Sequence, residues 1–363
     1  MHPTRRTIIA GASAGPWILG ASTVRADDLY WPDGREWERL APGEAGFDPA
    51  ALEAAVRGAL DDQSFCVLVL RRGRIVAEAY GSRGGRDEVH ELASAAKSVV
   101  SVLVGIAIDE GRIKGVDQSA SDFIVQWKGT PKAAITIRNL LTMTSGLHFQ
   151  GLAIRNIAGD QLALNAAAAL DSPPGTHWAY ATPMLHLLYH LLEIATGEPF
   201  EAFAQRALIG PLGMENWTWV TNEGQGATGP VKNYYTARCS ARDLARFGLF
   251  ALRGGRWKGR QLVSASYFRA ATSPSQVINP AYGYLWWLNA HPGENAAGTK
   301  TGYQFAGSPP DTFGALGAGG QVAIETPSRD LVVVRQGRQP RNPMATVNLQ
   351  AQVVVALGKV SAS

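Results

Sequence analysis

The sequence has few cysteines and lacks long apolar runs. Only Cys66 and Cys239 occur among 363 residues, too few for a disulfide framework, so a hydrophobic core has to hold the fold. Cys66 lies in the apolar run SFCVLVL and is expected to be a packed thiol; whether it pairs with Cys239 stays open. No run approaches the roughly 18 to 20 apolar residues of a membrane-spanning helix, so no span is predicted.

Neither sign of charge is in large excess. The chain has 34 Lys and Arg against 30 Asp and Glu, which gives a formal net charge of +4. Residues 1–26 contribute three arginines and no acidic residue, so the rest of the chain has a net charge of only +1. A nucleic-acid partner is therefore not supported.

The N-terminal segment MHPTRRTIIAGASAGPWILGASTVRA has a basic start, a middle of apolar and small residues, and a small-residue exit at Ala26. This order is typical of a secretory signal peptide, and the Arg5-Arg6 pair favours the twin-arginine type. We expect residues 1–26 to be removed, residues 27–363 to form the mature protein, and the protein to be periplasmic or secreted.

Strand patterns lie near both ends of the chain, and helix patterns lie mainly between them. β-Rich runs occur at 65–81, 282–290, 320–327 and 330–337. Helices are expected at 48–60, from about 95 to 110 and at 345–358, and residues 114–275 are expected to be helices and loops. We predict an α/β fold with an antiparallel sheet built from N- and C-terminal strands and flanked by helices. A mostly helical domain is inserted at about 114–275.

Ser94 and Lys97 stand three residues apart at the start of a long apolar helix, so their side chains share one face. A partly desolvated lysine loses its proton more readily than one in water and could accept the serine's proton. The helix dipole would stabilise the negative charge that then develops. The alternative is an N-cap serine beside a lysine that extends to the surface. The S-x-x-K spacing is that of β-lactamases and penicillin-binding proteins.

Several ordered segments resemble the serine β-lactamase and penicillin-binding-protein-like hydrolases, in particular the class C β-lactamase branch. LASAAKSVVSVLVGIAIDEGRI resembles the nucleophile helix of that family, and PPGTHWAYAT resembles the segment with its catalytic tyrosine. The resemblance implies that Tyr180 is the tyrosine of the Y-x-N motif and relays protons with a depressed pKa. Thr182 stands where the family has the asparagine that binds the acyl amide, and it can still hydrogen-bond.

The third family motif has two candidates. Lys300-Thr301-Gly302 matches the K-T-G triad literally, but Ala315-Leu316-Gly317 has the family's spacing to the segment that ends at Pro327. We align Ala315-Leu316-Gly317 with the motif and keep Lys300 as the alternative. In either case we expect the Ala318 N–H and the Ser94 N–H to hold the oxyanion, with Gly317 allowing close backbone approach.

The expected function is that of an exported serine hydrolase which forms an acyl-enzyme on an ester or small amide, with no metal or organic cofactor. His186, His190 and Glu193 lie along one helix face, but their pattern lacks the metalloprotease glutamate, and we expect no metal site there. Aromatic residues that could line an apolar acyl pocket are Trp178, Tyr234, Tyr235, Trp286 and Trp287.

Two alternatives remain for the activity. A β-lactamase or D-Ala-D-Ala carboxypeptidase is favoured if Lys300 reaches Ser94. A non-catalytic binding protein on the same scaffold is disfavoured by the intact set of Ser94, Lys97 and Tyr180. The expected partner is a small-molecule substrate, and the sequence does not indicate an oligomeric state.

Overall fold

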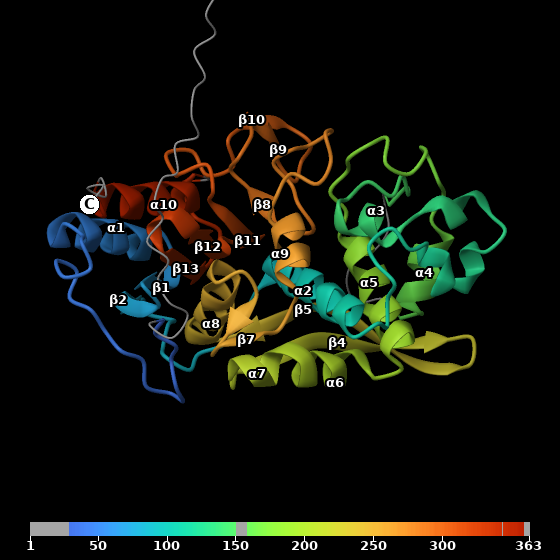
Figure 1. Cartoon of the computed structure of the whole chain (residues 1–363), viewed down its shortest axis with the longest axis horizontal. Coiled ribbons are helices and arrows are strands. Elements are labelled where there is room, and N and C mark those ends of the chain that lie inside the picture. The colour runs from blue at the N-terminus through green and yellow to red at the C-terminus, as the bar shows by residue number, and fades with distance from the viewer. Residues whose placement is uncertain (1–28, 150–157, 343, 359–363) are drawn as a thin grey trace, which may run out of the picture.

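The computed structural model describes residues 29–149, 158–342 and 344–358. Its main sheet consists of β1 (Ser64–Arg71), β2 (Arg74–Tyr80), β8 (Trp287–Leu288), β11 (Phe313–Gly317), β12 (Gln321–Thr326) and β13 (Leu331–Gly337). The strand order is β2-β1-β13-β12-β11-β8 and every neighbouring pair is antiparallel (Figure 1). Strands from both ends of the chain therefore pair in one sheet, which confirms the predicted fold class.

Both faces of this sheet are covered by helices. On β1, Val67 and Val69 pack in a cluster with α1 (Pro49–Asp61) and α10 (Ala345–Ala356). Leu68 and Leu70 point the opposite way, into the larger core. Helix α8 (Ala241–Leu252) covers β12 and β13. Because successive side chains of a strand alternate between faces, a strand that is buried on both sides is a continuous apolar run.

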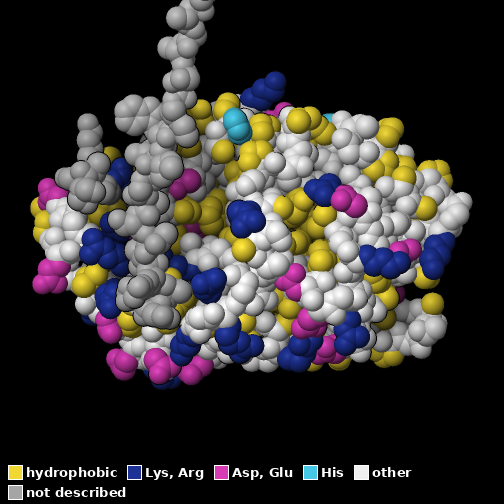
Figure 2. All heavy atoms as spheres, in the orientation of Figure 1, with side chains coloured by type: hydrophobic (Ala, Val, Ile, Leu, Met, Phe, Trp, Pro, Cys, Tyr) yellow, Lys and Arg dark blue, Asp and Glu magenta, His cyan; other side chains and the backbone are white. Residues whose placement is uncertain are grey.

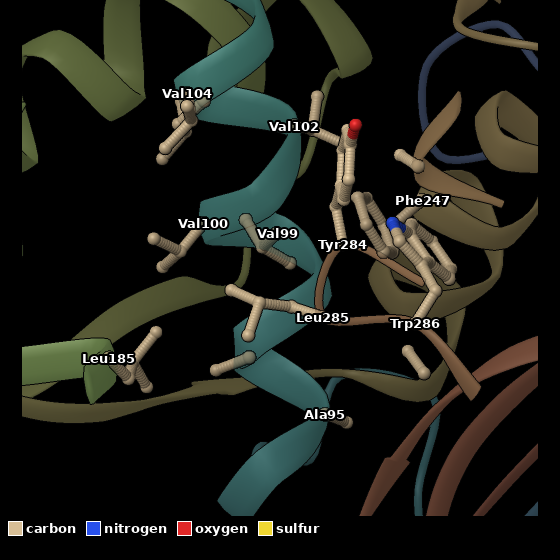
Figure 3. Close-up of a cluster of buried hydrophobic side chains, with 14 of the residues drawn as sticks. Ala95, Val99, Val100, Val102, Val104, Leu185, Phe247, Tyr284, Leu285 and Trp286 are labelled. Carbon is tan, nitrogen blue, oxygen red and sulfur yellow. The ribbon is translucent and has the colours of Figure 1, made fainter. Parts of the chain in front are cut away.

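Helix α2 (Ala96–Asp109) runs through the middle of the molecule, as the long apolar helix pattern predicts. Every residue from Ala96 to Ala107 is buried. Figure 3 shows Val100 and Val104 on one side of α2, the side on which Leu185 lies, and Val102 on the other, toward Tyr284 and Phe247. Such all-round burial holds the first turn of α2, and any group on it, in a fixed place.

Further helices lie between Ile137 and Leu212. They are α3 (Ile137–Leu141), α4 (Gln161–Ala167), α5 (Thr182–Thr196), α6 (Phe200–Ala204), the π-helical η6 (Gln205–Ile209) and α7 (Gly210–Leu212). Short 3-10 turns are η3 (Ala120–Asp122), η4 (Val125–Trp127) and η5 (Pro131–Ala134). A further one, η7 (Pro327–Arg329), lies between β12 and β13. Helix α5 begins with Pro183 in its first turn and ends at Gly197 in the left-handed conformation, as the capping pattern indicates.

The segment 114–275, which was expected to contain only helices and loops, also contains strands. It contains a long antiparallel hairpin of β4 (Trp217–Gly226) and β5 (Gly229–Cys239), and β3 (His90–Glu91) pairs with β5. Several glycines interrupt the alternating pattern in this stretch, and its two-residue turn Ala227-Thr228 lacks the usual glycine signal. Helix α8 packs mainly on the strands β12 and β13 of the main sheet and also contacts β1 and α7.

The strand expected at 282–290 is mostly a tight turn. Leu285 has a positive φ of 61°, and the Gly283 N–H donates to the Trp286 carbonyl at 2.9 Å, so only β8 pairs as a strand. The other short elements nearby are β6 (Arg256–Trp257), β7 (Arg260–Gln261), α9 (Ala265–Ala271), β9 (Gly293–Glu294) and β10 (Lys300–Gly302). The aromatic side chains of this stretch are buried by packing and do not require a strand.

Cys66 and Cys239 are both free thiols in buried positions. Burial raises the pKa of the Cys66 thiol to about 12, so this group stays neutral. Among the described residues no helix is long and apolar enough to cross a membrane. The leader expected at 1–26 lies outside the described residues. On the face in Figure 2, basic and acidic side chains are interspersed along the lower edge.

Glu325 on β12 is expected to destabilise the fold in a pH-dependent way. Its side chain is fully buried, and neither carboxyl oxygen has a hydrogen-bond partner among the described residues. Burial raises its pKa well above the usual range, so the folded state holds a proton that the unfolded chain releases above about pH 4.5. The unfolded state then binds fewer protons than the folded state, and this residue lowers stability as pH rises.

Glu325→Gln, which removes the ionisation but keeps the size, should therefore raise the free energy of unfolding more at pH 8 than at pH 4.5. We expect a gain of about 1–3 kcal/mol at pH 8, measured by urea unfolding. An equal effect at both pH values would contradict a buried neutral carboxyl.

Candidate active site

Ser94 lies in the 3-10 turn η2 (Ala93–Ala95), directly before α2. The residue before it, Ala93, has a φ of 48°, a left-handed conformation that is unfavourable for a residue with a Cβ atom. Strand β5 supports this turn, because the Thr236 hydroxyl donates to the Ala93 carbonyl at 2.7 Å and the Leu92 N–H donates to the Ala237 carbonyl at 2.8 Å. The turn makes no side-chain capping bond, so the alternative of Ser94 as an N-cap is wrong.

Lys97 is buried beside Ser94. Its side chain is 2% exposed, which excludes the alternative of an ammonium group extended to the surface. The Nζ atom donates to Ser94 Oγ at 2.9 Å and to Thr182 Oγ1 at 3.4 Å. Desolvation by burial lowers the pKa of Lys97 from 10.5 to about 7. A large fraction of the amine is therefore neutral near pH 7 and able to accept a proton from the serine.

Tyr180 completes the group that the sequence predicts. Its hydroxyl interacts with the Ser94 side chain, and Lys97 Nζ lies 5.0 Å from the centre of its ring. Burial raises the pKa of Tyr180 to about 12, and the interaction with Ser94 only partly opposes this rise. The expectation of a depressed tyrosine pKa is wrong. Lys97 is the group tuned toward a base, and the phenol keeps its proton.

Aromatic side chains surround Tyr180. Trp287 stacks on its ring with centroids 5.7 Å apart, Tyr282 packs edge-on at 6.1 Å, and Trp178 lies at 6.4 Å. These rings desolvate the phenol and fix its direction. Of the five aromatic residues considered for an acyl pocket, Trp178 and Trp287 hold Tyr180 instead, and Tyr234 and Trp286 lie in the core.

A cavity of about 500 Å³ opens beside Ser94. Its walls are formed by residues of η2, α2, α5, β5 and the ends of β11, β12 and β13, namely Glu91, Ala93, Ser94, Lys97, Thr182, Tyr235, Thr236, Ala318, Gly319, Gln321 and Gly337. Hydroxyl, carboxamide, carboxylate and amine groups share this lining with alanine and glycine residues. A second cavity of about 560 Å³ also has Thr182 and Tyr180 in its wall. Thr182 therefore lines both cavities.

The third-motif candidates differ clearly in position. Ala315 is fully buried on β11, and Ala318 follows the end of this strand in the wall of the Ser94 cavity. Lys300 is exposed on β10, which pairs with β9 in a separate two-stranded sheet. The structure therefore brings Ala315-Leu316-Gly317 to Ser94, in line with the alignment preferred from spacing.

Gly317 is required by the close approach of β11 to the serine turn. A Cβ atom built at Gly317 would lie 2.1 Å from the Leu92 carbonyl oxygen and 3.0 Å from the Ala95 nitrogen, both backbone atoms. Gly317→Ala should push β11 away from η2 and lower kcat/KM by about 10-fold or more, because a misplacement of about 1 Å at a reacting centre has large effects. Gly58→Ala is the matched control, since no atom lies within 4 Å of a Cβ there. Steady-state kinetics that agree for the two variants would contradict this account.

His186 and His190 are buried on α5. Burial lowers the pKa of His186 to about 3, and its Nδ1 lies 3.4 Å from Asn165 Nδ2. His190 Nδ1 lies 3.2 Å from Glu193 Oε2. Among the described residues no group of three or more His, Cys, Asp or Glu side chains could hold a metal ion.

Sequence reasoning missed several residues of the site. Thr236 reaches the cavity from β5 and Gln321 reaches it from β12, whereas Tyr235 was among the aromatic residues considered for the pocket and does line the cavity. No short motif marks them, because their place depends on strand pairing and on the packing of β5 against η2 rather than on local spacing.

The chain matches a protein family and several known proteins. The family model described as Beta-lactamase matches residues 52–355. The 6-aminohexanoate-dimer hydrolase of Paenarthrobacter ureafaciens is 24% identical over 264 residues, which are 64% of this chain and 66% of that protein. Esterase EstB of Burkholderia gladioli is 28% identical over 211 residues, 50% of this chain and 51% of the esterase.

A solved structure has the same fold. The penicillin-binding protein homolog from Caulobacter crescentus superposes with a TM-score of 0.64 at 18% identity, covering 86% of this chain and 99% of that one. At this identity the likeness concerns the fold alone.

Proposed function

Because the chain belongs to the Beta-lactamase family, we propose that it is an exported serine hydrolase that cleaves esters or small amides through an acyl-enzyme. The observation that carries this proposal is the contact of Lys97 Nζ with Ser94 Oγ at 2.9 Å, made by a buried amine whose pKa lies at about 7. The relatives named as an esterase and an amide hydrolase support the same reaction class.

In the first half of the reaction, neutral Lys97 takes the proton of the Ser94 hydroxyl while Oγ attacks the substrate carbonyl carbon. The N–H groups of Ser94 and Ala318 are the proposed donors to the oxyanion of the tetrahedral intermediate. Collapse of this intermediate breaks the bond to the leaving group. Tyr180, which is neutral before this step because of its raised pKa, donates the proton that the leaving oxygen or nitrogen needs, and the protonated Lys97 returns a proton to the resulting phenolate.

In the second half a water molecule attacks the acyl-enzyme. Neutral Lys97 accepts a proton from this water molecule, and the same two N–H groups hold the oxyanion. Lys97 then returns the proton to Ser94 Oγ as the serine leaves. Each group returns to its starting state. The residues Ser94, Lys97 and Tyr180 are sufficient for this cycle.

The cavity lining favours a short or polar acyl group. Hydroxyl, carboxamide and carboxylate groups share the lining with small apolar residues, so the cavity of about 500 Å³ offers a long alkyl chain no continuous apolar wall. The position of Lys300 on the separate β9–β10 sheet argues against its use in binding a β-lactam carboxylate. We therefore place esters and small amides ahead of β-lactams as substrates.

The test uses the chain from residue 27 onward. A fluorophosphonate should label the protein, with the adduct mapped to Ser94 by peptide mass spectrometry. Turnover is then compared for p-nitrophenyl acetate, p-nitrophenyl dodecanoate, a 6-aminohexanoate dimer, a chromogenic cephalosporin and a D-Ala-D-Ala peptide. We expect the acetate to exceed the dodecanoate and the cephalosporin in kcat/KM.

Cephalosporin turnover well above that of the esters would instead favour a β-lactamase. Absence of labelling together with inertness toward all five substrates would favour a binding protein. Export is tested separately, by cell fractionation after replacement of Arg5 and Arg6 by Lys: the wild-type leader should deliver the protein to the periplasm, and the double variant should retain it in the cytoplasm.

A further inference from the structure

Arg335 of β13 is a buried arginine that the reaction scheme does not use. Its side chain is 1% exposed. All five of its N–H groups donate to oxygen atoms: Nε to Ser64 Oγ at 2.7 Å, Nη1 to the carbonyls of Gly319 and Gly320 at 2.8 and 2.9 Å, and Nη2 to the carbonyls of Asp62 and Arg338, each at 3.2 Å. These acceptors come from three different parts of the chain, at residues 62–64, 319–320 and 338.

None of these five acceptors is a carboxylate. The guanidinium charge is therefore satisfied by a hydroxyl and four backbone carbonyls rather than by an ion pair. A buried charge is costly compared with an apolar side chain, and the neighbouring residues Leu331 to Val334 of the same strand are all apolar. Stability of the strand alone does not account for an arginine here.

The chain around the guanidinium is shaped to admit it. A Cβ atom at Gly320 would lie 2.2 Å from Arg335 Nη1, and a Cβ atom at Gly337 would lie 2.8 Å from Nη2. Gly319 and Gly320 both have positive φ angles, 80° and 74°. The turn between β11 and β12 thus wraps its carbonyls around the guanidinium, in a conformation that glycine permits.

The same turn borders the reaction centre. Ala318 and Gly319 line the cavity beside Ser94, and Gly317 abuts the serine turn. We propose that Arg335 is a positioning residue that holds the turn 317–321 so that the Ala318 N–H points at the developing oxyanion. Arg335 contacts neither Ser94 nor substrate; it acts through the turn. This inference rests on the proposed function, in which Ala318 is one of two oxyanion donors.

The variants are Arg335→Met, which removes all five donors, and Arg335→Lys, which keeps the charge and can donate to part of the turn. Arg246→Met is the matched control, because Arg246 is 7% exposed, donates to the Gly34 carbonyl and lies on α8 away from the Ser94 cavity. Each protein is measured at 15 °C, after circular dichroism has established that it is folded. The readouts are kcat and KM for p-nitrophenyl acetate, and the affinity for an alkyl boronic acid that forms a tetrahedral adduct with Ser94.

Loss of a whole oxyanion donor costs about 10²–10³-fold in rate, so a displaced donor should cost part of this. We expect Arg335→Met to lower kcat by about 10- to 100-fold with KM within threefold, and to weaken boronic acid binding by a similar factor. Arg335→Lys should recover part of kcat. Arg246→Met should lose stability but keep kcat within threefold.

A kcat for Arg335→Met within threefold of wild type would overturn the inference, as would an equal loss of kcat in Arg246→Met. If Arg335→Met does not fold, Arg335→Lys decides: a wild-type kcat there is the overturning result. Failure of the wild type to bind the boronic acid at Ser94 would instead reject the proposed function, so the two failures are distinguishable.

Discussion

Ser94→Ala is expected to lower kcat/KM for p-nitrophenyl acetate by about 10³-fold or more and to abolish labelling by a fluorophosphonate. Without Oγ no acyl-enzyme forms, whereas the backbone donors and the cavity remain. The fold should persist, because Ser94 makes no capping bond to α2 and the η2 turn is held by the Thr236 hydroxyl and by β5. Circular dichroism and urea unfolding check this second point.

The matched control for this variant is Ser101→Ala on the same helix. Ser101 is fully buried on α2 and lines neither cavity described above, so removal of its hydroxyl should leave the site unchanged. We expect wild-type turnover and labelling for Ser101→Ala. Labelling that persists in Ser94→Ala would reveal a different nucleophile and reject the mechanism.

Lys97→Met should abolish turnover to a similar degree and at the same time stabilise the protein. The folded-state pKa of Lys97 is about 7 and the reference value is 10.5, so between these pH values the unfolded chain binds a proton that the folded protein does not. The free energy of unfolding of the wild type therefore rises with pH through this window. The cost of burying the amine is complete below about pH 7 and vanishes above about pH 10.5.

A shift of this size corresponds to about 5 kcal/mol at most, and loss of the bonds to Ser94 and Thr182 reduces what the variant gains. Urea unfolding at pH 6 and pH 10 should show a gain for Lys97→Met at pH 6 that is much smaller at pH 10. Lys128→Met, at an exposed position, should show no such dependence. A variant less stable than wild type at pH 6 would argue against a desolvated amine.

The same pKa governs the pH dependence of the wild type. Because only neutral Lys97 accepts the serine proton, kcat/KM should rise with pH through about 7 and reach a plateau above it. Stability acts in the opposite direction at Glu325, where the penalty grows with pH. The burial cost of Lys97 falls as pH rises above about 7, so the two groups have opposing effects on stability, and the activity profile alone reports Lys97.

The proposed nucleophile and its base could be predicted from the sequence because their relation is local. Three residues of helix bring Ser94 and Lys97 to one face whatever the rest of the chain does. The role of Tyr180 was predicted from the motif in which it stands. The spacing to Pro327 favoured Ala315-Leu316-Gly317 over Lys300 as the third motif. The β4–β5 hairpin was missed, because glycines interrupt its alternating pattern and its turn lacks the usual signal residues.

Helix and strand periodicity, the apolar character of α2 and the spacing of the motif residues are properties of short segments, and the amino-acid order alone determined them. The protonation states of Lys97 and Tyr180 were decided only in the folded molecule, where Thr182 and the rings of Trp178, Tyr282 and Trp287 come together from distant segments. The place of the turn that contains Ala318 was also decided there, because Arg335 of β13 donates to the carbonyls of Gly319 and Gly320 in this turn. Desolvation and hydrogen bonding depend on which segments pack together, and pattern within a segment does not carry that information.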